Sequence, residues 1–493
     1  MTKTRRAADL TWGTAPALAT LTWLLASPLA AQTDQLAETS PTPVAPPDGS
    51  ATLVAPPEPV PPPPPEVAVV PPPPPVAPPP PPATSFSLRP TASIFVRPEI
   101  RQGFEDLGPL PPLVATIAND LVRYRFRFGL TLEPIDLGRV TVSARMAPQA
   151  AGLGWASGGT LTDVALDLHE GVLLLNTERL AFEIGRFEMA YGEEMIIGPV
   201  GWHHIGRAFD GIRMRAKVGT GAAYVDVFAT QLIENLDTNF AAGDVLFFGA
   251  YAGLGPLLKE GLDLDVYALE LLTAEDPTPP ATTPPAPPAP DNLPRLSTTT
   301  LGSRVRYRAE SWDVRAEAGV QLQTSSAAGA DLKLAYHADA EVGIRFGTRF
   351  RLSAHALFAS GANGDNVAGW NQLFPTAHAF LGLSDIMGAR TNVVSGVFHA
   401  WGQLAEGLTG NIDVHVFARP EGATSGYSGL ETDVGLGWTI GRGLVLRGVY
   451  ALFVPSDEAY ATSTPAHFAE LELRYTLTPP PPPPPPAAPA PAR

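Results

Sequence analysis

Hydrophobic and polar residues alternate with a period of two along many segments of the chain. In the segment 122–132, Val, Tyr, Phe and Leu fill the even positions, while Arg123, Arg125 and Arg127 fall on odd ones. The segment 332–346 repeats the pattern, with apolar residues on the even positions and polar ones such as Glu341 between them. This alternation is typical of strands with one apolar and one polar face, and about 9 to 11 such residues cross a bilayer.

The connections between the alternating segments are of two kinds. Eighteen expected strands cover residues 91–104, 120–132, 138–147, 160–175, 179–188, 211–218, 222–231, 244–252, 262–272, 298–309, 312–323, 331–346, 348–359, 392–402, 409–419, 429–440, 443–454 and 466–477. Tight connections occur at 176–178, 219–221 and 441–442, whereas 189–210 and 360–391 are long. A soluble antiparallel sandwich alternates as well, but short turns opposite long loops, with an even strand number, favour an outer-membrane barrel.

These patterns predict an all-β fold class, a transmembrane antiparallel β-barrel of about 18 strands within residues 84–478. No other segment of the sequence has the run of apolar residues expected of a membrane helix. A barrel of this size is too wide for side chains to fill and leaves an aqueous lumen. We therefore expect the functional residues on the lumen wall.

The N-terminus has the composition of an export signal. Residues 1–31 begin with Lys3, Arg5 and Arg6, continue with the apolar stretch 17–25 and end in small residues. The apolar stretch is shorter than the ~20 residues that a spanning helix needs. The sequence predicts a secretory signal peptide, and the adjacent arginines leave the twin-arginine route as an alternative.

Proline-rich segments flank the predicted barrel. Residues 32–83 contain runs such as Pro61–Pro65 and Pro71–Pro75, and residues 479–493 form a similar tail. Such runs favour polyproline II, a stiff rod suited to a spacer across the periplasm, and a disordered linker is the alternative. With both ends on the short-turn side, the termini are expected in the periplasm, where export or cell-wall components are candidate partners.

Charge and composition argue against several other functions. A formal net charge of -16 argues against a nucleic-acid partner, and the chain has no cysteine for thiol chemistry. Its sequence contains no recognised catalytic or phosphate-binding motif, so we expect neither enzyme activity nor a cofactor. His203 and His204 suggest a metal pair, but adjacent side chains on an extended chain point apart, so no metal site is expected. His378 is expected to cap or pack the second long loop.

The polar face of the predicted strands carries many arginines. We expect lumen-lining side chains at Arg123, Arg125, Arg127, Arg145, Arg213, Arg215, Arg304, Arg306, Arg349 and Arg351. Acidic residues lie mainly on other strands and include Asp226, Asp263, Asp265, Asp413, Glu431 and Asp433. Opposed charged walls attract ions and still release them, and the arginine fork matches carboxylates. Alternatively, these charges only solvate the interior and pair across strands, although three like charges at 123, 125 and 127 need partners or a solute.

Two segments resemble the alginate-export family of outer-membrane porins. The first comprises EIGRF (183–187), GPVGW (198–202) and GRAFDGIR (206–213), and the second comprises LFPTAH (373–378) and GLSD (382–385). The resemblance implies a barrel of about eighteen strands that exports anionic polysaccharide through an arginine-rich pore. It also implies that Arg186, Arg207, Asp210 and Arg213 belong to the pore or its loop support. The proline spacers and a proline-rich loop near 277–294 depart from the family pattern.

The sequence therefore supports one main hypothesis and two alternatives. The hypothesis is an outer-membrane channel for anionic solutes, with export of an anionic, uronate-type polysaccharide as its specific form. One alternative is a general diffusion porin with little selectivity. The other is a structural outer-membrane anchor whose barrel is plugged by its loops. The expected partners are outer-membrane lipid and an anionic solute or polysaccharide.

Overall fold

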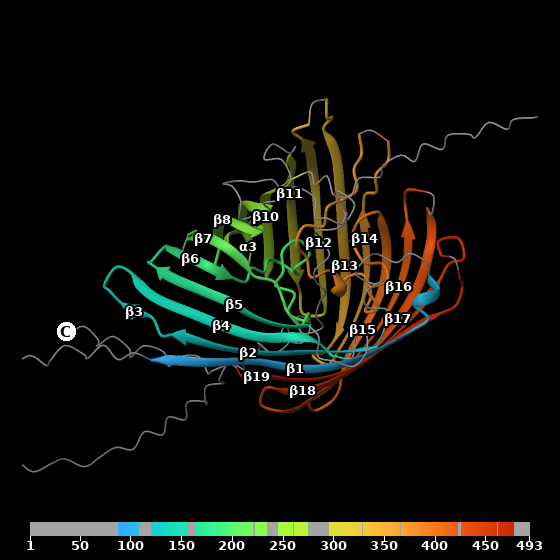
Figure 1. Cartoon of the computed structure of the whole chain (residues 1–493), viewed down its shortest axis with the longest axis horizontal. Helices are drawn as coiled ribbons and strands as arrows, with labels where there is room; N and C mark the ends of the chain where they lie inside the picture. The colour runs from blue at the N-terminus through green and yellow to red at the C-terminus, as the bar shows by residue number, and fades with distance from the viewer. Residues whose placement is uncertain are drawn as a thin grey trace, which may run out of the picture.

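The computed structural model contains one antiparallel sheet that closes on itself into a barrel (Figure 1). The structure describes residues 87–107, 120–154, 163–219, 222–233, 245–259, 261–274, 295–327, 329–364, 366–422, 425–460 and 462–477. The predicted signal peptide, proline-rich spacer, proline-rich loop near 277–294 and C-terminal tail lie outside these residues. Their assignments therefore stay predictions.

Eighteen wall strands lie within the described ranges. They are β1 (Leu88–Gln102), β2 (Leu121–Leu132), β4 (Thr141–Gly154), β5 (Asp163–Asn176), β6 (Leu180–Phe187), β7 (Phe209–Lys217), β8 (Tyr224–Ile233), β9 (Val245–Gly253), β10 (Leu262–Ala274), β11 (Arg295–Arg308), β12 (Trp312–Ser325), β13 (Lys333–Phe346), β14 (Phe350–Ala359), β15 (Val393–Ala405), β16 (Leu408–Arg419), β17 (Gly426–Gly441), β18 (Leu444–Pro455) and β19 (Ala466–Leu477). The additional β3 (Ile135–Asp136) pairs only with β4. Short helices occur at η2 (Glu105–Leu107), α3 (Gly255–Leu258) and η3 (Ala377–Ala379). Among the described helices, none has the length and apolar character needed to span a bilayer.

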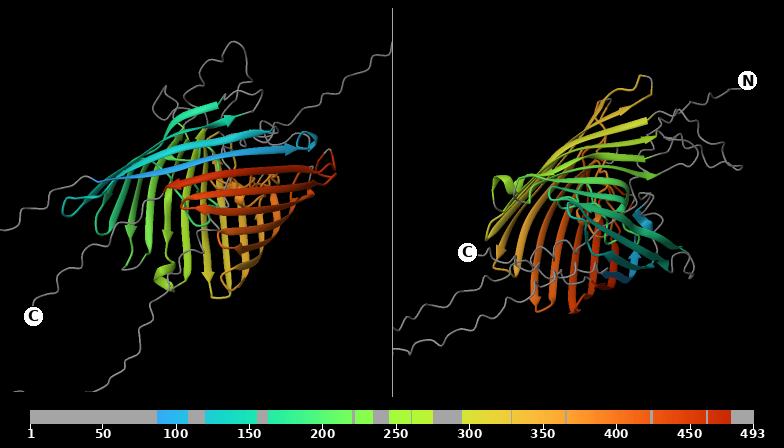
Figure 2. Two further views of the ribbon diagram at one scale, coloured as in Figure 1. Left: turned by 90° about the horizontal axis from the view of Figure 1, so that it is seen from below. Right: turned by 90° about the vertical axis from the view of Figure 1, so that its left-hand side faces the viewer.

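The barrel closes because the first strand pairs with the last. On β1, Val96 lies opposite Tyr124 of β2 on one side and Leu473 of β19 on the other. The described sheet consequently has no open edge (Figure 2). Closure is what hydrocarbon demands of a sheet, since backbone groups there have no water to bind. The prediction of an all-β barrel of about 18 strands is confirmed, and each expected segment overlaps one wall strand.

Connections differ in length between the two ends of the barrel. Residues 347–349 and 406–407 make tight turns, whereas 188–208 and 360–392 are long connections at the other end. The start of β1 and the end of β19 both lie at the short-turn end, because Ala92 pairs with Leu477. The two ends of the barrel body therefore leave from the same side. Their placement in the periplasm stays a prediction.

Alternation along the strands sorts side chains between the outer surface and the interior. On β13, Asp339 and Glu341 are 3% and 5% exposed, whereas Val342 and Ile344 are both 54% exposed. β2 shows the same division, with its arginines inside and Phe128 outside. The predicted faces of segments 122–132 and 332–346 are confirmed. The outer surface is an apolar band suited to lipid.

A β-bulge interrupts the alternation in β5. Ala147 of β4 pairs with Glu170, but the next residue, Pro148, pairs with Leu168, so His169 is left over. The bulge lets consecutive polar side chains face the interior. There His169 contacts Glu188 at 2.6 Å, and Glu170 binds Arg145 at 2.8 Å.

The apolar core of the protein lies inside the barrel. Phe187, Phe209 and Phe247 on β6, β7 and β9 are fully buried. They belong to one cluster with Met195 and Ile197 from the connection 188–208. Because an empty barrel of this width would hold water, this core shows that long connections enter the lumen.

We predict that an arginine in the middle of the outer surface destabilises the barrel. Leu301 lies halfway along β11 and is 45% exposed. The change Leu301→Arg should lower the free energy of unfolding from lipid vesicles by about 2–4 kcal/mol, because the charge must enter hydrocarbon. The matched change Thr348→Arg in the exposed turn 347–349 should stay within about 0.5 kcal/mol. Equal stability of both variants would contradict a lipid-facing β11.

Candidate functional site

Two long connections fill much of the lumen and pack against each other. We call residues 188–208 loop A and residues 360–392 loop B. Ile197 of loop A forms a parallel bridge with Phe374 of loop B, and the amide of Gly198 donates to the Phe374 carbonyl oxygen at 2.8 Å. The rings of Trp202 and His378 stack with centroids 4.1 Å apart. The loops therefore form one folded unit inside the barrel.

A buried arginine of loop A holds the two loops together. The Arg207 guanidinium donates through Nη1 to the carbonyl oxygens of Gly198 at 3.0 Å and Pro375 at 3.2 Å, and also to that of Phe374. Burial lowers the pKa of Arg207 to about 9, so the group stays charged at neutral pH. Arg207 consequently supports the loops rather than facing a solute.

Loop A crosses the barrel from one wall to the opposite one. At one end, the Trp202 carbonyl oxygen accepts a hydrogen bond from Arg97 of β1 at 3.2 Å, and the Arg97 guanidinium lies 3.7 Å above the Trp202 ring. At the other end, Glu193 binds Arg304 and Arg306 of β11. Eight wall strands separate β1 from β11 in each direction around the ring. Loop A therefore acts as a crossbar that divides the lumen.

The three predicted arginines of β2 lie beneath this crossbar. Arg123 binds Glu99 at 2.7 Å, and Arg127 binds Glu188 of loop A at 3.0 Å. Arg125 donates to the His203 carbonyl oxygen at 3.2 Å and to Ser93 at 3.0 Å. These arginines point inward, but their guanidiniums already bind the wall and loop A. Arg123 and Arg127 thus have carboxylate partners within the protein, whereas Arg125 binds a carbonyl oxygen and a hydroxyl group.

The predicted lumen arginines of β4 and β7 lie on one side of the crossbar and are paired. Arg145 binds Glu170, Arg213 binds Glu183 and Arg215 binds Asp226, with distances between 2.7 and 2.8 Å. These three arginines line a cavity between the wall and loop A. Half-exposed Arg186 lies 3.6 Å from Asp167 and 3.5 Å from Asp210. Arg186 and Asp210 share the outward parity of Ile184 and Ile212, so they do not line the lumen. Pairing across strands, the alternative weighed from the sequence, describes this side.

Arg349 does not lie on a strand. It occupies the exposed turn 347–349, and β14 begins one residue later, at Phe350. The turn starts at Gly347 with a φ of +61°, a conformation that favours glycine and ends the preceding strand. The expectation that Arg349 lines the lumen from a strand beginning at 348 is therefore wrong.

The main cavity lies on the other side of the crossbar, between the loops and β11–β17. Its volume is about 190 Å³, compared with about 430 Å³ for the cavity beside β4 and β7, and we call it the main cavity because more charged side chains line it. From β11–β14 it is lined by five arginines and only two carboxylates, which are Arg306, Arg308, Arg315, Arg345, Arg351, Asp313 and Glu341. Other acidic groups face it from loop A and from β16 and β17. The cavity therefore has a basic wall on β11–β14 and, beyond β15, an acidic wall on β16 and β17.

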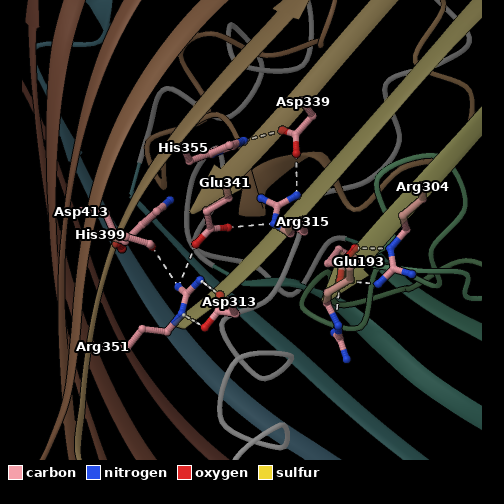
Figure 3. Close-up of polar contacts among 12 residues, drawn as sticks. Glu193, Arg304, Asp313, Arg315, Asp339, Glu341, Arg351, His355, His399 and Asp413 are labelled. Atoms are coloured by element: carbon pink, nitrogen blue, oxygen red, sulfur yellow. Dashed lines mark hydrogen bonds and ion pairs between the residues drawn. The ribbon is translucent and has the colours of Figure 1, made fainter. Parts of the chain in front are cut away.

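The basic wall shares its few carboxylates among several guanidiniums (Figure 3). Asp313 binds Arg345 at 2.7 Å and Arg351 at 2.5 Å. Glu341 binds both Arg315 and Arg351 at 2.7 Å. Arg315 also binds Asp339 at 2.6 Å. Because each guanidinium has five N–H donors, a wall with five arginines and these three carboxylates can still bind a further anion.

Histidines oriented by aspartates lie on β14, β15 and β16, where the basic wall meets the acidic wall. His399 contacts Asp413 at 2.7 Å, His415 lies 3.5 Å from Asp433, and His355 pairs with Asp339 (Figure 3). Their rings form a row with centroids 5.8 and 6.2 Å apart. These histidines are absent from the residues that the sequence predicts. Their inward parity on β14, β15 and β16 was the available signal.

The predicted acidic residues of β17 anchor loop B. Glu431 accepts hydrogen bonds from the Ser384 amide at 2.8 Å and the Ser384 hydroxyl at 2.6 Å. Asp433 accepts one from the Leu383 amide at 3.1 Å. These carboxylates therefore fix the position of loop B against the acidic wall.

His203 and His204 lie side by side, contrary to the geometry expected of adjacent residues. Their ring centroids are 4.1 Å apart because this part of loop A is a turn rather than an extended strand. Burial and the nearby Arg123 lower the pKa of His204 to about 3, so its ring stays neutral. Within the described ranges, no group of three or more His, Asp or Glu side chains has an arrangement that could hold a metal ion.

Comparisons with known proteins identify relatives of this barrel. A family model described as alginate export matches residues 174–443. No curated protein sequence matches the chain. The fold is similar to Pseudomonas aeruginosa OccK2 (OpdF) in complex with glucuronate, with 12% identity, a TM-score of 0.53, and coverage of 79% of this chain and 98% of that one. It is also similar to Pseudomonas aeruginosa OpdK with vanillate (15%, 0.52, 79% and 98%) and Acinetobacter baumannii OccAB2 (11%, 0.53, 79% and 98%).

We predict that loop A needs glycine at position 192. Gly192 has a φ of +57°, and a Cβ added there would lie 2.7 Å from Cδ of Arg304. The change Gly192→Ala should loosen loop A and speed amide hydrogen exchange in residues 188–208 by roughly tenfold or more, since both strain and a clash are introduced. Gly364→Ala in loop B is the control, because its φ is +67° but its Cβ would meet nothing within 4 Å. Similar exchange in loop A for both variants would show that contact with Arg304 is unimportant.

Proposed function

The chain belongs to the alginate export family, and on that premise we propose that its lumen passes anionic solutes. The family and the closed barrel are those of a porin-type channel of the bacterial outer membrane rather than of an enzyme. The solute class is the part that we propose. It rests on the charge distribution around the main cavity.

The observation that carries the proposal is the basic wall of β11–β14. Five arginines and two carboxylates face the main cavity there, and Asp313 and Glu341 are each shared by two arginines. Such a surface attracts anions and orients them through paired N–H donors. The carboxylates of the acidic wall, together with the histidines, keep the binding weak enough for release. Arg306 and Arg351 are thus the predicted pore-lining residues best placed to meet a solute, because both line this cavity.

A carboxylate-bearing sugar is the solute class that we favour. Guanidinium forks match carboxylates in planar pairs, and the ligands named for two structurally similar porins, glucuronate and vanillate, are both carboxylates. The adjacent row of histidines on β14–β16 offers hydrogen bonds to hydroxyl groups. The sugar residues of a uronate-type polysaccharide would pass one after another along this wall. Export would run from the short-turn end, which we expect in the periplasm.

A second candidate function follows from the packing of loops A and B. The two loops share a buried core with the wall and cross the lumen, as expected of a structural anchor with a plugged barrel. Conductance of the refolded full chain in planar bilayers separates the possibilities. An anion-preferring current supports the channel, a current with weak ion preference supports a general porin, and a complete lack of current supports the anchor.

We predict that removing one charge from the basic wall reduces anion preference. Arg351→Gln should lower the ratio of chloride to potassium permeability by roughly two- to fivefold, because one charge near the ion path is lost in a partly aqueous setting. The ratio is obtained from reversal potentials across a salt gradient. The control Arg442→Gln changes the same charge in the exposed turn between β17 and β18 and should leave the ratio nearly unchanged. A drop of equal size in both variants would refute a specific role for β11–β14.

A further inference from the structure

The carboxylate of Glu193 occupies an arginine site on the opposite wall. Arg304 donates to Glu193 through Nε and, at 2.5 Å, through Nη2, and Arg306 donates to it through Nη1 at 3.1 Å. Figure 3 shows this contact between loop A and the wall. Two guanidiniums around one carboxylate is also the arrangement that an anionic solute would adopt.

The donors of these two arginines are divided between the wall and the lumen. Arg304 binds Asp265 of β10 through Nη1 at 2.7 Å, and Arg306 binds Asp263 of β10 through Nε at 2.9 Å. The wall carboxylates therefore hold both guanidiniums in place. The remaining donors named above face loop A and converge on Glu193. The result is a preformed carboxylate site whose occupant is part of the protein.

Loop A is shaped to deliver this carboxylate. The positive φ of Gly192 brings the backbone against the Arg304 side chain, at a distance that a Cβ would prevent. Although burial alone would raise it, the hydrogen bond and charge of Arg304 lower the pKa of Glu193 to about 2, so the carboxylate stays ionised. The adjacent Glu194 binds Thr376 of loop B instead, at 2.5 Å.

We propose that Glu193 is an internal stand-in for the solute, and that a solute carboxylate opens the lumen by replacing it between Arg304 and Arg306. This inference rests on the proposed passage of anionic solutes. A solute carboxylate preserves the pairing of both arginines, so the exchange avoids leaving buried charges without partners. The solute binds this site only when loop A has left it, and such preferential binding shifts the population towards the open state.

The attachment of Glu193 to loop A also determines how much solute is needed to displace it. A carboxylate on a short connection competes at an effective concentration on the order of millimolar. Solute must therefore accumulate in the barrel before loop A yields. The rate of solute passage would then depend on solute concentration more steeply than in a permanently open pore.

The test compares conductance of the full chain in planar bilayers with and without sodium glucuronate. For the wild type, we expect a low conductance that rises with millimolar glucuronate. Glu193→Gln keeps the shape of the side chain but removes its charge, so it should raise conductance without glucuronate by roughly tenfold and abolish the further rise. Glu193→Asp, whose carboxylate is one methylene shorter, should lie between the two. The matched control Glu406→Gln, which removes the same charge in the exposed turn 406–407, should behave as the wild type.

The outcomes separate this inference from the proposed function. If Glu193→Gln conducts as the wild type does, and glucuronate acts equally on both, the stand-in role is refuted while anion passage survives. If the wild type shows neither anion preference nor any response to glucuronate, the proposed function itself fails. Circular dichroism of each variant confirms the barrel. If Glu193→Gln does not refold, Glu193→Asp provides the test. A Glu193→Asp channel with the conductance and glucuronate response of the wild type would also overturn the inference.

Discussion

The structure depends on the requirement that every backbone N–H and C=O group within hydrocarbon has a partner inside the protein. A flat sheet leaves two edges unpaired, so β1 must meet β19, and eighteen strands must curve into a ring. Closure by this many strands produces an interior wider than side chains alone can fill. The lumen and the charges that line it are therefore consequences of backbone hydrogen bonding. What occupies the lumen then decides function.

The interior of the barrel combines an apolar core with a cavity lined by charged side chains. On the side of β6–β9, phenylalanines of the wall and apolar residues of loops A and B form a buried core. On the side of β11–β14, arginines share too few carboxylates around an open cavity. Buried guanidiniums are tolerated because each finds carboxylates, carbonyl oxygens or ring faces. Arg97 illustrates this with two wall carboxylates within 3.2 Å and the Trp202 ring above it.

The periodicity of the sequence was sufficient for the fold but not for the site. Alternation on β13 predicted which residues face lipid, because hydrocarbon acts on every second side chain. The bulge at His169 has no such signature, and it changes which polar groups point inward. Ion pairs such as His399 with Asp413 depend on strand register, where a slip of one residue alters every contact. The path of loop A depends on contacts between residues far apart in the sequence, so Arg125 was expected to face a solute and instead lies beneath His203.

The diametric path of loop A also has a mechanical consequence. A wide ring of strands resists deformation only through its wall. Loop A, which binds both β1 and β11, braces the ring against the lateral pressure of the bilayer. Release of Glu193 would detach loop A from β11. Entry of the solute and loss of barrel stiffness would then be one event. The thickness and tension of the surrounding membrane would therefore influence how readily the solute enters.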